Sequence, residues 1–457
     1  MVSFEITASE FEGLTRLDPE YYQPAYRKHT KPIADICEES MKSVCDIVMG
    51  PAYSSKSFNT IKESIPISKI GDVTNKRSID NWETISRDEF IKYHSVLINK
   101  NDILLTMTGD PPDVGKTYIP YSQYHLDRLI TFNQRVAKIR GRSIDQFYLY
   151  AFLQSEKFRL RIEQVALGIR QRNISIPDLK SAYIFIPDDD KDISFISDLI
   201  KRHFELEQLS QSLYTQAQEI LERELGLDKL VFDRPLSYEA RLSEVVGKHR
   251  GDAEFHNPTL RLCYHELNKN SQLNRITKYG DVLKFGNPAY ANSGVPIITQ
   301  KHLQEITPSG YGTDLLADES WVNKYPKAIL RKNDLLFYSV GAYLGKTNIW
   351  LNEDKAVHAS FITMIRCNED YDAGYLMVLL NSKYGILQSK VFQSGTSQQY
   401  IYPKYIKQFL IPEVEKSIKV KIADYIFKSH QAKIESHQLL EQAKHRVEQL
   451  IEQAVQK

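Results

Sequence analysis

Apolar residues recur along this chain with two rhythms, which predict two kinds of element. Short apolar runs bounded by Gly, Pro and Asn are typical of strands joined by turns. In residues 146–164 and 373–391 the apolar positions instead recur every three or four residues, which predicts an amphipathic helix in each segment. A mixed α/β domain of about 150 residues is therefore expected in each half of the chain. The strand-like runs are SVLI, DILLTM and YIFIP in the first half, and AILR, DLLFYSV and FLIP in the second.

Each half continues into a segment with a seven-residue apolar repeat, typical of a long helix that packs against another helix. Acidic residues stand near both starts (Asp188–Asp190, and Glu413 with Glu415), which suits a helix N-terminus. Helices of about 35–40 residues would span roughly 50–60 Å, and we expect them to pair as an antiparallel coiled coil. The repeat positions are Ile196, Leu199, Leu206, Leu213, Ala217 and Ile220, then Ile422, Ile426, Leu440, Ala443, Val447, Leu450 and Ala454; His203, Ser210, Ser429, Lys433 and Ser436 interrupt them.

The chain repeats itself with a period of about 230 residues. Each match is short, but all occur in the same order in both halves, so the sequence indicates an internal duplication. The matches are RLDPEYYQP (from Arg16) with RGDAEFHNP (from Arg250), Pro51-Ala52-Tyr53 with Pro288-Ala289-Tyr290, Ile65-Pro66-Ile67 with Val295-Pro296-Ile297, Lys100-Asn101-Asp102 with Lys332-Asn333-Asp334, Gly115-Lys116-Thr117 with Gly345-Lys346-Thr347, Gly168, Gln171 and Ile174 with Gly395, Gln398 and Ile401, and Ile186-Pro187 with Ile411-Pro412.

These patterns predict an α+β fold with two tandem α/β domains, each followed by a long helix. The expected boundaries are 1–187 for the first domain, 188–228 for the first helix, 229–412 for a linker with the second domain, and 413–457 for the second helix.

Composition places the chain among ordinary globular proteins, because hydrophobic residues make up 42% and charged residues 26%. No apolar run approaches the length of a membrane span, and the N-terminus does not resemble a secretory signal. The four cysteines form no CxxC pair. We therefore expect the protein to be located in the reducing cytoplasm. The net charge of +1 hides an uneven distribution. Residues 41–187 carry roughly six excess positive charges, residues 188–248 roughly six negative ones, and residues 249–412 roughly four positive ones.

Two motifs approach catalytic patterns without completing them. Asp110-Pro111-Pro112-Asp113 lacks the aromatic fourth residue of the motif with which amino-methyltransferases hold their target amine, and no Gly-rich cofactor loop precedes it. Gly115-Lys116-Thr117 has the wrong glycine spacing for a phosphate-binding loop and precedes a strand-like run, so we interpret it as a hairpin tip with an exposed lysine. The 12 histidines show no metal-ligand spacing. We expect no catalytic residue, no metal and no cofactor.

Two divergent α/β domains that end in Gly-x-x-Gln-x-x-Ile and Ile-Pro, each followed by a long helix, resemble the specificity subunits of type I restriction–modification enzymes. The matching segments run from Gly168 through Gln171 and Ile174 to Pro177, and from Gly395 through Gln398 and Ile401 to Pro403. The resemblance implies that each domain reads one half of a split double-stranded DNA site and that the helices set the gap. It implies two methyltransferase subunits as partners, a motor-nuclease subunit as a further one, and no membrane.

Side chains that suit DNA contacts occur on the loops of both halves. Phosphates are bound by Lys, Arg, hydroxyls and backbone N–H groups, and base edges by Arg, Lys, Asn and Gln. The two copies would read different half-sites, so the repeated Gly-Lys-Thr and Gly-x-x-Gln motifs suit the scaffold or phosphates better than bases. The DNA-binding candidates are Lys76, Arg77, Lys116, Thr117, Arg170, Gln171 and Arg172 in the first domain, and Lys346, Thr347, Gln398, Gln399 and Tyr400 in the second.

Three alternatives remain open on the sequence. The first is a specificity chain of a related type II restriction enzyme, because the opening RLDPEYYQP differs from that of the best-known members of the family. A coiled-coil scaffold for protein interactions is the second, and a gel shift at low salt would discriminate it. An enzyme without a recognisable motif is the third, and cofactor binding by the isolated chain would support it.

Overall fold

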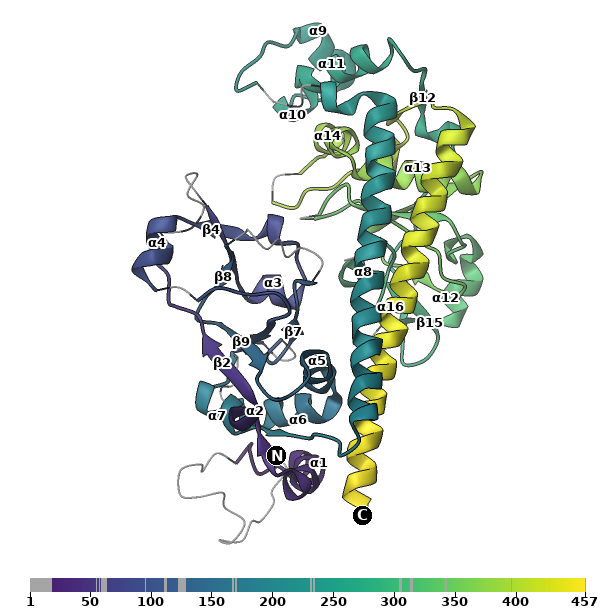
Figure 1. Cartoon of the computed structure of the whole chain (residues 1–457). Coiled ribbons are helices and arrows are strands. Elements are labelled where there is room, and N and C mark those ends of the chain that lie inside the picture. Colours follow the sequence, from purple (N-terminus) through teal and green to yellow (C-terminus); the bar gives the residue numbers. More distant parts are fainter. Residues whose placement is uncertain are drawn as a thin grey trace. The chain divides into compact units, whose positions relative to one another are not determined.

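The computed structural model of this chain forms two compact units. The first comprises Met1–Gln208 with Ile434–Lys457, and the second comprises Leu209–Lys433. Each unit holds an α/β fold and one part of each of two long helices, and Figure 1 shows the elements along the chain. The described residues are 19–54, 56, 58, 64–94, 96–110, 113–121, 129–166, 168, 171–230, 232, 235–303, 306–312, 315–341, 343–395 and 397–456.

The first unit contains a four-stranded antiparallel sheet in the order β2-β9-β5-β7 and a three-stranded sheet in the order β4-β3-β8. In the second sheet, β3 and β8 are parallel. The apolar strand residues close a buried core with two consecutive helices, α5 and α6. These elements are β2 (Cys45–Met49), β3 (Ile65–Ser68), β4 (Glu83–Ile85), β5 (Ile103–Thr106), β7 (Thr117–Tyr118), β8 (Thr131–Phe132), β9 (Val136–Gly141), α5 (Gln146–Gln154) and α6 (Glu156–Val165).

The second unit repeats this arrangement and adds one strand, β14, to its second sheet. Its first sheet has the order β13-β20-β17-β18, and its second has the order β14-β16-β15-β19, in which β15 and β19 are again the parallel pair. The duplication predicted from the sequence therefore reappears as two folds with one topology. The corresponding elements are β13 (Gly280–Leu283), β14 (Tyr290–Ala291), β15 (Val295–Ile298), β16 (Leu316–Ala317), β17 (Asp334–Tyr338), β18 (Thr347–Ile349), β19 (Val357–His358), β20 (Ile362–Cys367), α13 (Asp370–Asn381) and α14 (Lys383–Phe392).

Shorter elements complete the two units. In the first unit they are α1 (Pro24–Ile36), β1 (Glu39–Ser40), α2 (Met41–Val44), α3 (Ile70–Thr74), α4 (Arg87–Lys92), β6 (Thr108–Gly109), β10 (Arg172–Asn173), α7 (Ile176–Ser181) and β11 (Tyr183–Ile184). In the second unit they are α9 (Leu242–Lys248), α10 (Ala253–His256), α11 (Pro258–Leu267), β12 (Leu273–Arg275), α12 (Glu319–Lys324), α15 (Pro403–Ile406) and β21 (Leu410–Pro412).

An ion pair at the start of the central strand is the same in both units. The carboxylate of Asp102 accepts a hydrogen bond from Arg140, and that of Asp334 accepts one from Arg366. The residue before each aspartate is an asparagine with positive φ, +66° at Asn101 and +69° at Asn333. Asparagine tolerates this left-handed conformation better than most residues. The repeated Lys-Asn-Asp motif is therefore a turn that places a buried carboxylate.

Each of the two predicted amphipathic helices is broken in the middle. Where one helix was expected over 146–164, α5 ends before Ser155, and the Ser155 hydroxyl accepts a hydrogen bond from the backbone N–H of Phe158 to begin α6. Ser382 separates α13 from α14 in the same way and accepts from Gly385. Serine is a strong N-cap residue, because its side chain satisfies an N–H group that the helix leaves free. The local capping signal thus overrides the continuous apolar pattern.

Two of the predicted strands are irregular segments. In SVLI, Ser95 lies outside the described residues, and 96–98 form no strand although Ile98 is buried. In AILR, Leu330 is buried without strand structure. The backbone N–H groups of these two residues bond to Ile130 and Ala356, respectively. The apolar side chains anchor these loops to the core, so their burial, which caused the prediction, does not require a strand.

The first unit joins its α/β fold to both long helices, α8 (Asp190–Leu225) and α16 (Lys416–Gln456). Arg446 bonds to Asp192 at 2.6 Å, and the buried His203 Nδ1 lies 2.8 Å from Ser436 Oγ. The earlier residue of α8, Asp192, contacts the later residue of α16, Arg446, and the later His203 contacts the earlier Ser436. The two segments therefore run in opposite directions. The core of this unit includes Ile196, Ile200 and Phe204 from α8, and Leu440, Ala443, Val447, Leu450 and Ile451 from α16.

The second unit uses the other parts of the same two helices. The Ser210 hydroxyl donates to the Ser429 carbonyl at 2.8 Å, and the Ser429 hydroxyl donates back to the Ser210 carbonyl at 2.8 Å. Both serines are buried, so these polar interruptions of the apolar repeat satisfy each other. The core of this unit includes Ala217, Ile220, Leu221 and Leu225 from α8, and Ile422 and Ile426 from α16.

We expect Phe204→Ala to destabilise the first unit by about 3–5 kcal/mol, because it removes a buried ring and leaves a cavity. The Phe204 ring stacks on Tyr121 with centroids 5.0 Å apart and contacts Tyr150 at 5.2 Å. Phe195 lies on the same helix but is 54% exposed, so Phe195→Ala is the matched control and should change stability by less than about 0.5 kcal/mol. Urea unfolding checks both variants; equal effects would show that α8 is not part of this core.

Candidate nucleic-acid interface

The Gly-Lys-Thr motif forms the end of a β-hairpin in both units. Gly115 donates its N–H to the Thr106 carbonyl at 2.9 Å, and Gly345 donates to the Tyr338 carbonyl at 2.9 Å. Both glycines have positive φ, and a Cβ atom would lie 2.6 Å from Ile162 on α6 or 2.5 Å from Ser389 on α14. The repeated glycine is therefore required by close packing of a helix against the hairpin.

The lysines and threonines of this motif have different environments. Lys116 is exposed and bonds to Asp113 at 2.7 Å, whereas Lys346 is half-buried. Thr117 and Thr347 are buried at 4% and 2% exposure. Their side chains belong to the sheet interior, so we remove these two threonines from the expected DNA contacts.

The Gly-x-x-Gln-x-x-Ile motif is a tight loop that fastens onto the same hairpin. Gly168 (φ +119°) and Gly395 (φ +96°) lie so close to the carbonyl of the motif glutamine that a Cβ atom would approach it to 2.2 and 2.3 Å. The two isoleucines are buried, and their N–H groups bond at 2.9 Å to Met107 and Ser339, just before each hairpin loop. The motif is thus a structural clasp, and several of its described intermediate residues are exposed.

Most of the candidates on this loop are accessible. Gln171, Gln398 and Gln399 are exposed. Arg172 is half-buried, and its Nη1 donates to the Glu163 carbonyl at 3.3 Å. Tyr400 is half-buried and packs edge-on against Tyr402, with ring centroids 4.6 Å apart. Arg170 lies outside the described residues.

A third segment of the first unit carries the exposed residues Lys76 and Arg77. It turns sharply after α3, because Lys76 has a positive φ of 46°. The Arg77 carbonyl accepts hydrogen bonds from the Trp82 indole at 3.0 Å and the Tyr118 hydroxyl at 3.4 Å. Since Tyr118 belongs to β7, this turn is attached to the strand that follows Lys116.

In the first unit these contacts gather the three candidate segments. The hairpin pairs with the clasp loop through β6 and β10, with Gly109 opposite Arg172, and it meets the Arg77 turn through Tyr118. The described candidates in this unit therefore surround one hairpin. In the second unit the hairpin is likewise bonded to neighbouring loops. The Gly341 N–H donates to the Gln399 carbonyl of the clasp at 2.9 Å, and the Gln300 amide donates to the Val340 carbonyl at 3.2 Å.

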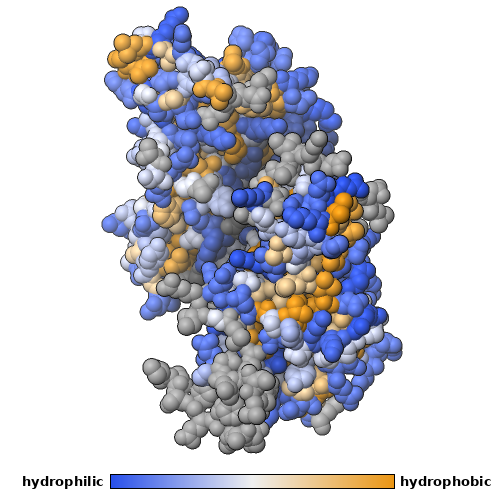
Figure 2. Space-filling view, turned by 90° about the vertical axis from the view of Figure 1, so that its left-hand side faces the viewer, coloured by the Kyte–Doolittle hydropathy of each residue, from blue (hydrophilic) through white to orange (hydrophobic). Residues whose placement is uncertain are grey.

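No group of three His, Cys, Asp or Glu side chains could hold a metal ion among the described residues. Asp113 donates its N–H to the Asp110 carbonyl. Pro111 and Pro112 lie outside the described residues. Figure 2 shows that hydrophilic residues cover much of one face, with hydrophobic residues in separate patches.

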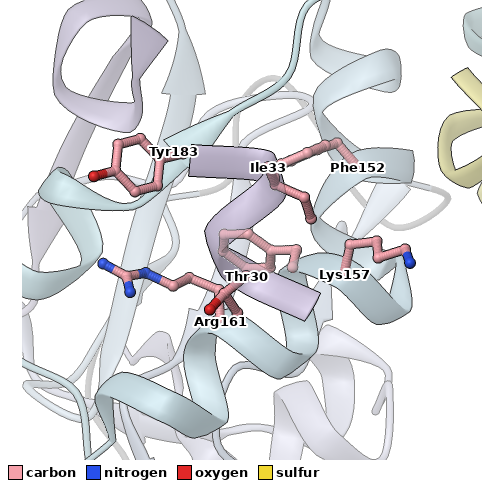
Figure 3. Close-up of a pocket in the computed structure, with 7 residues that line it drawn as sticks. Thr30, Ile33, Phe152, Lys157, Arg161 and Tyr183 are labelled. Atoms are coloured by element: carbon pink, nitrogen blue, oxygen red, sulfur yellow. The ribbon is translucent and has the colours of Figure 1, made fainter. Parts of the chain in front are cut away.

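A small cavity in the first unit lies between α1 and α6 (Figure 3). Its volume of about 20 Å³ has room for little more than one water molecule. Ile33, Phe152 and Phe158 contribute apolar walls, and the Arg161 side chain leaves it to bond to the Tyr21 hydroxyl at 2.9 Å. The cavity is therefore a packing gap rather than a ligand site. In the described residues, no helix has the length and apolar composition needed to cross a membrane.

Comparisons with known proteins give one matching family model and several solved structures that resemble this chain. Residues 37–213 match a family model described as the type I restriction modification DNA specificity domain. The chain resembles the S subunit of a type I restriction–modification system from M. genitalium, at 13% identity over 91% of this chain and 95% of that chain, with a TM-score of 0.44. It also resembles the HsdS subunit from Thermoanaerobacter tengcongensis, at 12% identity over 90% and 95% of the two chains, with a TM-score of 0.29.

A third similar structure comes from work on complex assembly and conformational transition of a type I restriction–modification system. It has 13% identity over 91% of this chain and 96% of that chain, with a TM-score of 0.30. A search of curated protein sequences gives no match.

The matched segment defines the class of this protein, because it covers most of the first α/β fold with the start of α8, and the second unit repeats that fold. It is a protein with a type I DNA specificity domain. The predicted resemblance to the specificity subunits of type I restriction–modification systems is confirmed over residues 37–213.

We expect Gly395→Ala to destabilise the second unit by about 1–3 kcal/mol, because alanine is strained at φ +96° and its Cβ would meet the Gln398 carbonyl. Gly247 lies inside α9 with nothing within 4 Å of a Cβ, so Gly247→Ala is a control of opposite sign that should stabilise its helix by about 0.5–1 kcal/mol. Thermal unfolding compares the two. A Gly395→Ala protein as stable as the wild type would contradict the clasp.

Proposed function

We propose that this chain is the non-catalytic specificity subunit that directs a type I complex to a bipartite double-stranded DNA site. Each α/β domain reads one half-site. The observation that carries the proposal is the repetition of one hairpin-and-clasp arrangement in two units that differ in their exposed loop residues. Two copies of one scaffold with different surfaces suit a protein that inspects two different sequences on one duplex.

In this proposal α8 and α16 form an antiparallel coiled coil that sets the gap between the half-sites. Helices of 36 and 41 residues would be roughly 54 and 62 Å long, which exceeds the ~34–36 Å of one DNA turn. Within each unit, buried polar residues of one helix meet buried polar residues of the other, as with Ser210 and Ser429. A register in which every buried polar group is satisfied supports a fixed pairing, because slippage would leave such groups unpaired.

The proposed partners are double-stranded DNA, two methyltransferase subunits and a motor-nuclease subunit. The methyl transfer belongs to the partners, since this chain offers no cofactor loop in its sequence. In the proposed division of labour, the domains of 1–187 and 229–412 bind DNA, and the helices of 188–228 and 413–457 hold them apart and receive the partners.

Sequencing the methylome of a host that expresses this chain with its methyltransferase partner tests the proposal. We expect one bipartite motif with two defined half-sites and a fixed gap. Methylation without a bipartite motif, or a chain that neither captures a methyltransferase nor shifts mixed duplex DNA at low salt, would contradict it. Cleavage by the same polypeptides at a fixed distance from the motif would instead favour the related type II system.

Lys116 is proposed to contact a DNA phosphate, since its side chain is exposed at the hairpin that the other candidates surround. Lys116→Ala should weaken binding by a similar factor for every sequence and reduce the slope of log K against log salt by about 1. Lys428 is also exposed but lies on α16 beside Asp424, so Lys428→Ala is the matched control. Fluorescence anisotropy over a salt series measures both slopes, and an unchanged slope for Lys116→Ala would remove this residue from the interface.

A further inference from the structure

The internal duplication allows each residue of one unit to be compared with its counterpart in the other. Cys45 faces Gly141 across β2 and β9, and Gly280 faces Cys367 across β13 and β20. Strand by strand, this register makes Met49, at the end of β2, the counterpart of Lys284, which directly follows β13. Two residues that share a backbone position but differ in chemistry are candidates for reading different half-sites.

In the second unit, Lys284 belongs to a small polar network. Its ammonium donates a hydrogen bond of 2.7 Å to the Ser339 hydroxyl, which also accepts from the Thr363 hydroxyl at 2.9 Å and donates to the Phe361 carbonyl at 3.0 Å. Ser339 and Thr363 are both fully buried. The serine hydroxyl therefore has a complete set of partners and holds the lysine ammonium at a defined place.

Every polar member of this network has an apolar counterpart in the first unit. Met107 corresponds to Ser339, because the carbonyl of each accepts an isoleucine N–H of the clasp and each donates its own N–H to the carbonyl just before the neighbouring strand. Ala137 corresponds to Thr363 by strand register. Phe132 corresponds to the buried His358 in the parallel strand pair. The three polar side chains of the network, and the buried His358 outside it, thus have apolar counterparts in the first unit.

Substitutions that merely repack a buried core do not account for this difference, because the position of Met49 and Lys284 is on the surface. Met49 is 47% exposed, which is unusual for a methionine without a partner, and Lys284 is also exposed. Although the residue as a whole is exposed, its ammonium bonds to the buried Ser339, and the resulting loss of hydration lowers the pKa of the Lys284 ammonium to about 8. An ammonium that is already partly dehydrated loses less hydration when it meets a base edge.

The position also adjoins the loops that the proposed function assigns to DNA. Ser339 directly precedes the hairpin loop that carries Lys346, and its carbonyl accepts the N–H of Ile401 from the clasp. Met107 stands at the same junction in the first unit. A side chain at 49 or 284 therefore emerges beside both loops while remaining supported by the sheet.

We propose, on the basis of the function above, that this position determines half-site specificity, with Lys284 donating to guanine in the second half-site and Met49 making an apolar contact with a thymine methyl in the first. A lysine has only donors, and guanine presents two adjacent acceptors, O6 and N7, in the major groove. A methionine offers no hydrogen bond, and the thymine methyl is the apolar feature of that groove. Ser339 is a positioning residue for the ammonium.

The test is selection of bound duplexes from a pool with both half-sites randomised, followed by sequencing, with the full-length chain. Lys284→Met should reduce the preference for guanine at one position of one half-site by about 5- to 150-fold and leave the other half-site unchanged. Met49→Lys should change one position of the opposite half-site towards guanine. Lys284→Arg keeps the donors and should keep the guanine. Ser339→Ala should weaken the guanine preference without replacing it.

Lys269→Met is the matched control, because Lys269 lies just beyond α11 and pairs with its neighbour Glu266. It should leave both half-sites unchanged. Equal loss of affinity for all sequences with Lys284→Met, together with a smaller salt slope, would identify a phosphate contact and overturn the inference. An unchanged sequence profile in a variant with wild-type thermal stability would overturn it as well. A wild-type chain that selects no bipartite sequence would instead refute the proposed function itself.

Discussion

Each α/β fold of this protein completes its core with apolar residues from both long helices, and the other features depend on this constraint. In the first unit Phe204 of α8 and Val447 of α16 belong to one buried cluster, and in the second Leu221 and Ile422 do so. These residues join the clusters that the strands form with α5 and α6 or with α13 and α14. A helix that contributes to a domain core cannot turn or slide without opening that core, so helix register and domain structure are set together.

The buried polar residues of the helices follow from the same constraint. A histidine or serine in an apolar seam costs stability unless it finds a partner, and His203 and Ser210 find theirs in Ser436 and Ser429. These contacts add little to stability compared with the apolar seam. Their larger effect is on uniqueness, since a displaced register would bury unsatisfied hydroxyl and imidazole groups. A protein proposed to measure a gap on DNA has a reason to keep such residues.

Periodicity and order revealed much of the fold, but not its local details. The heptad positions such as Leu206, Leu213 and Val447 are buried, and the repeated glycines lie at positive φ where the chain turns. The break at Ser155 was missed because capping acts over four residues, whereas periodicity is judged over a longer window. The burial of Thr117 and Thr347 was missed because a hydroxyl residue after a turn gives no sign of the face it occupies. Only the paired strands decide that.

The sequence alone does not indicate a role for Lys284, because this residue lies in no repeated motif. Repeated motifs in a duplicated protein identify what both copies need, which here is the scaffold: the Asp–Arg pair, the hairpin glycine and the clasp. Under the proposed function, residues that distinguish the two half-sites must instead differ, and they can be recognised only after the strand register shows which positions correspond. The contrast of Met49 with Lys284 at one backbone position, with Met107 and Ser339 beneath them, is such a difference. The residues proposed to set specificity therefore lie at positions where the two copies differ while the surrounding scaffold is the same.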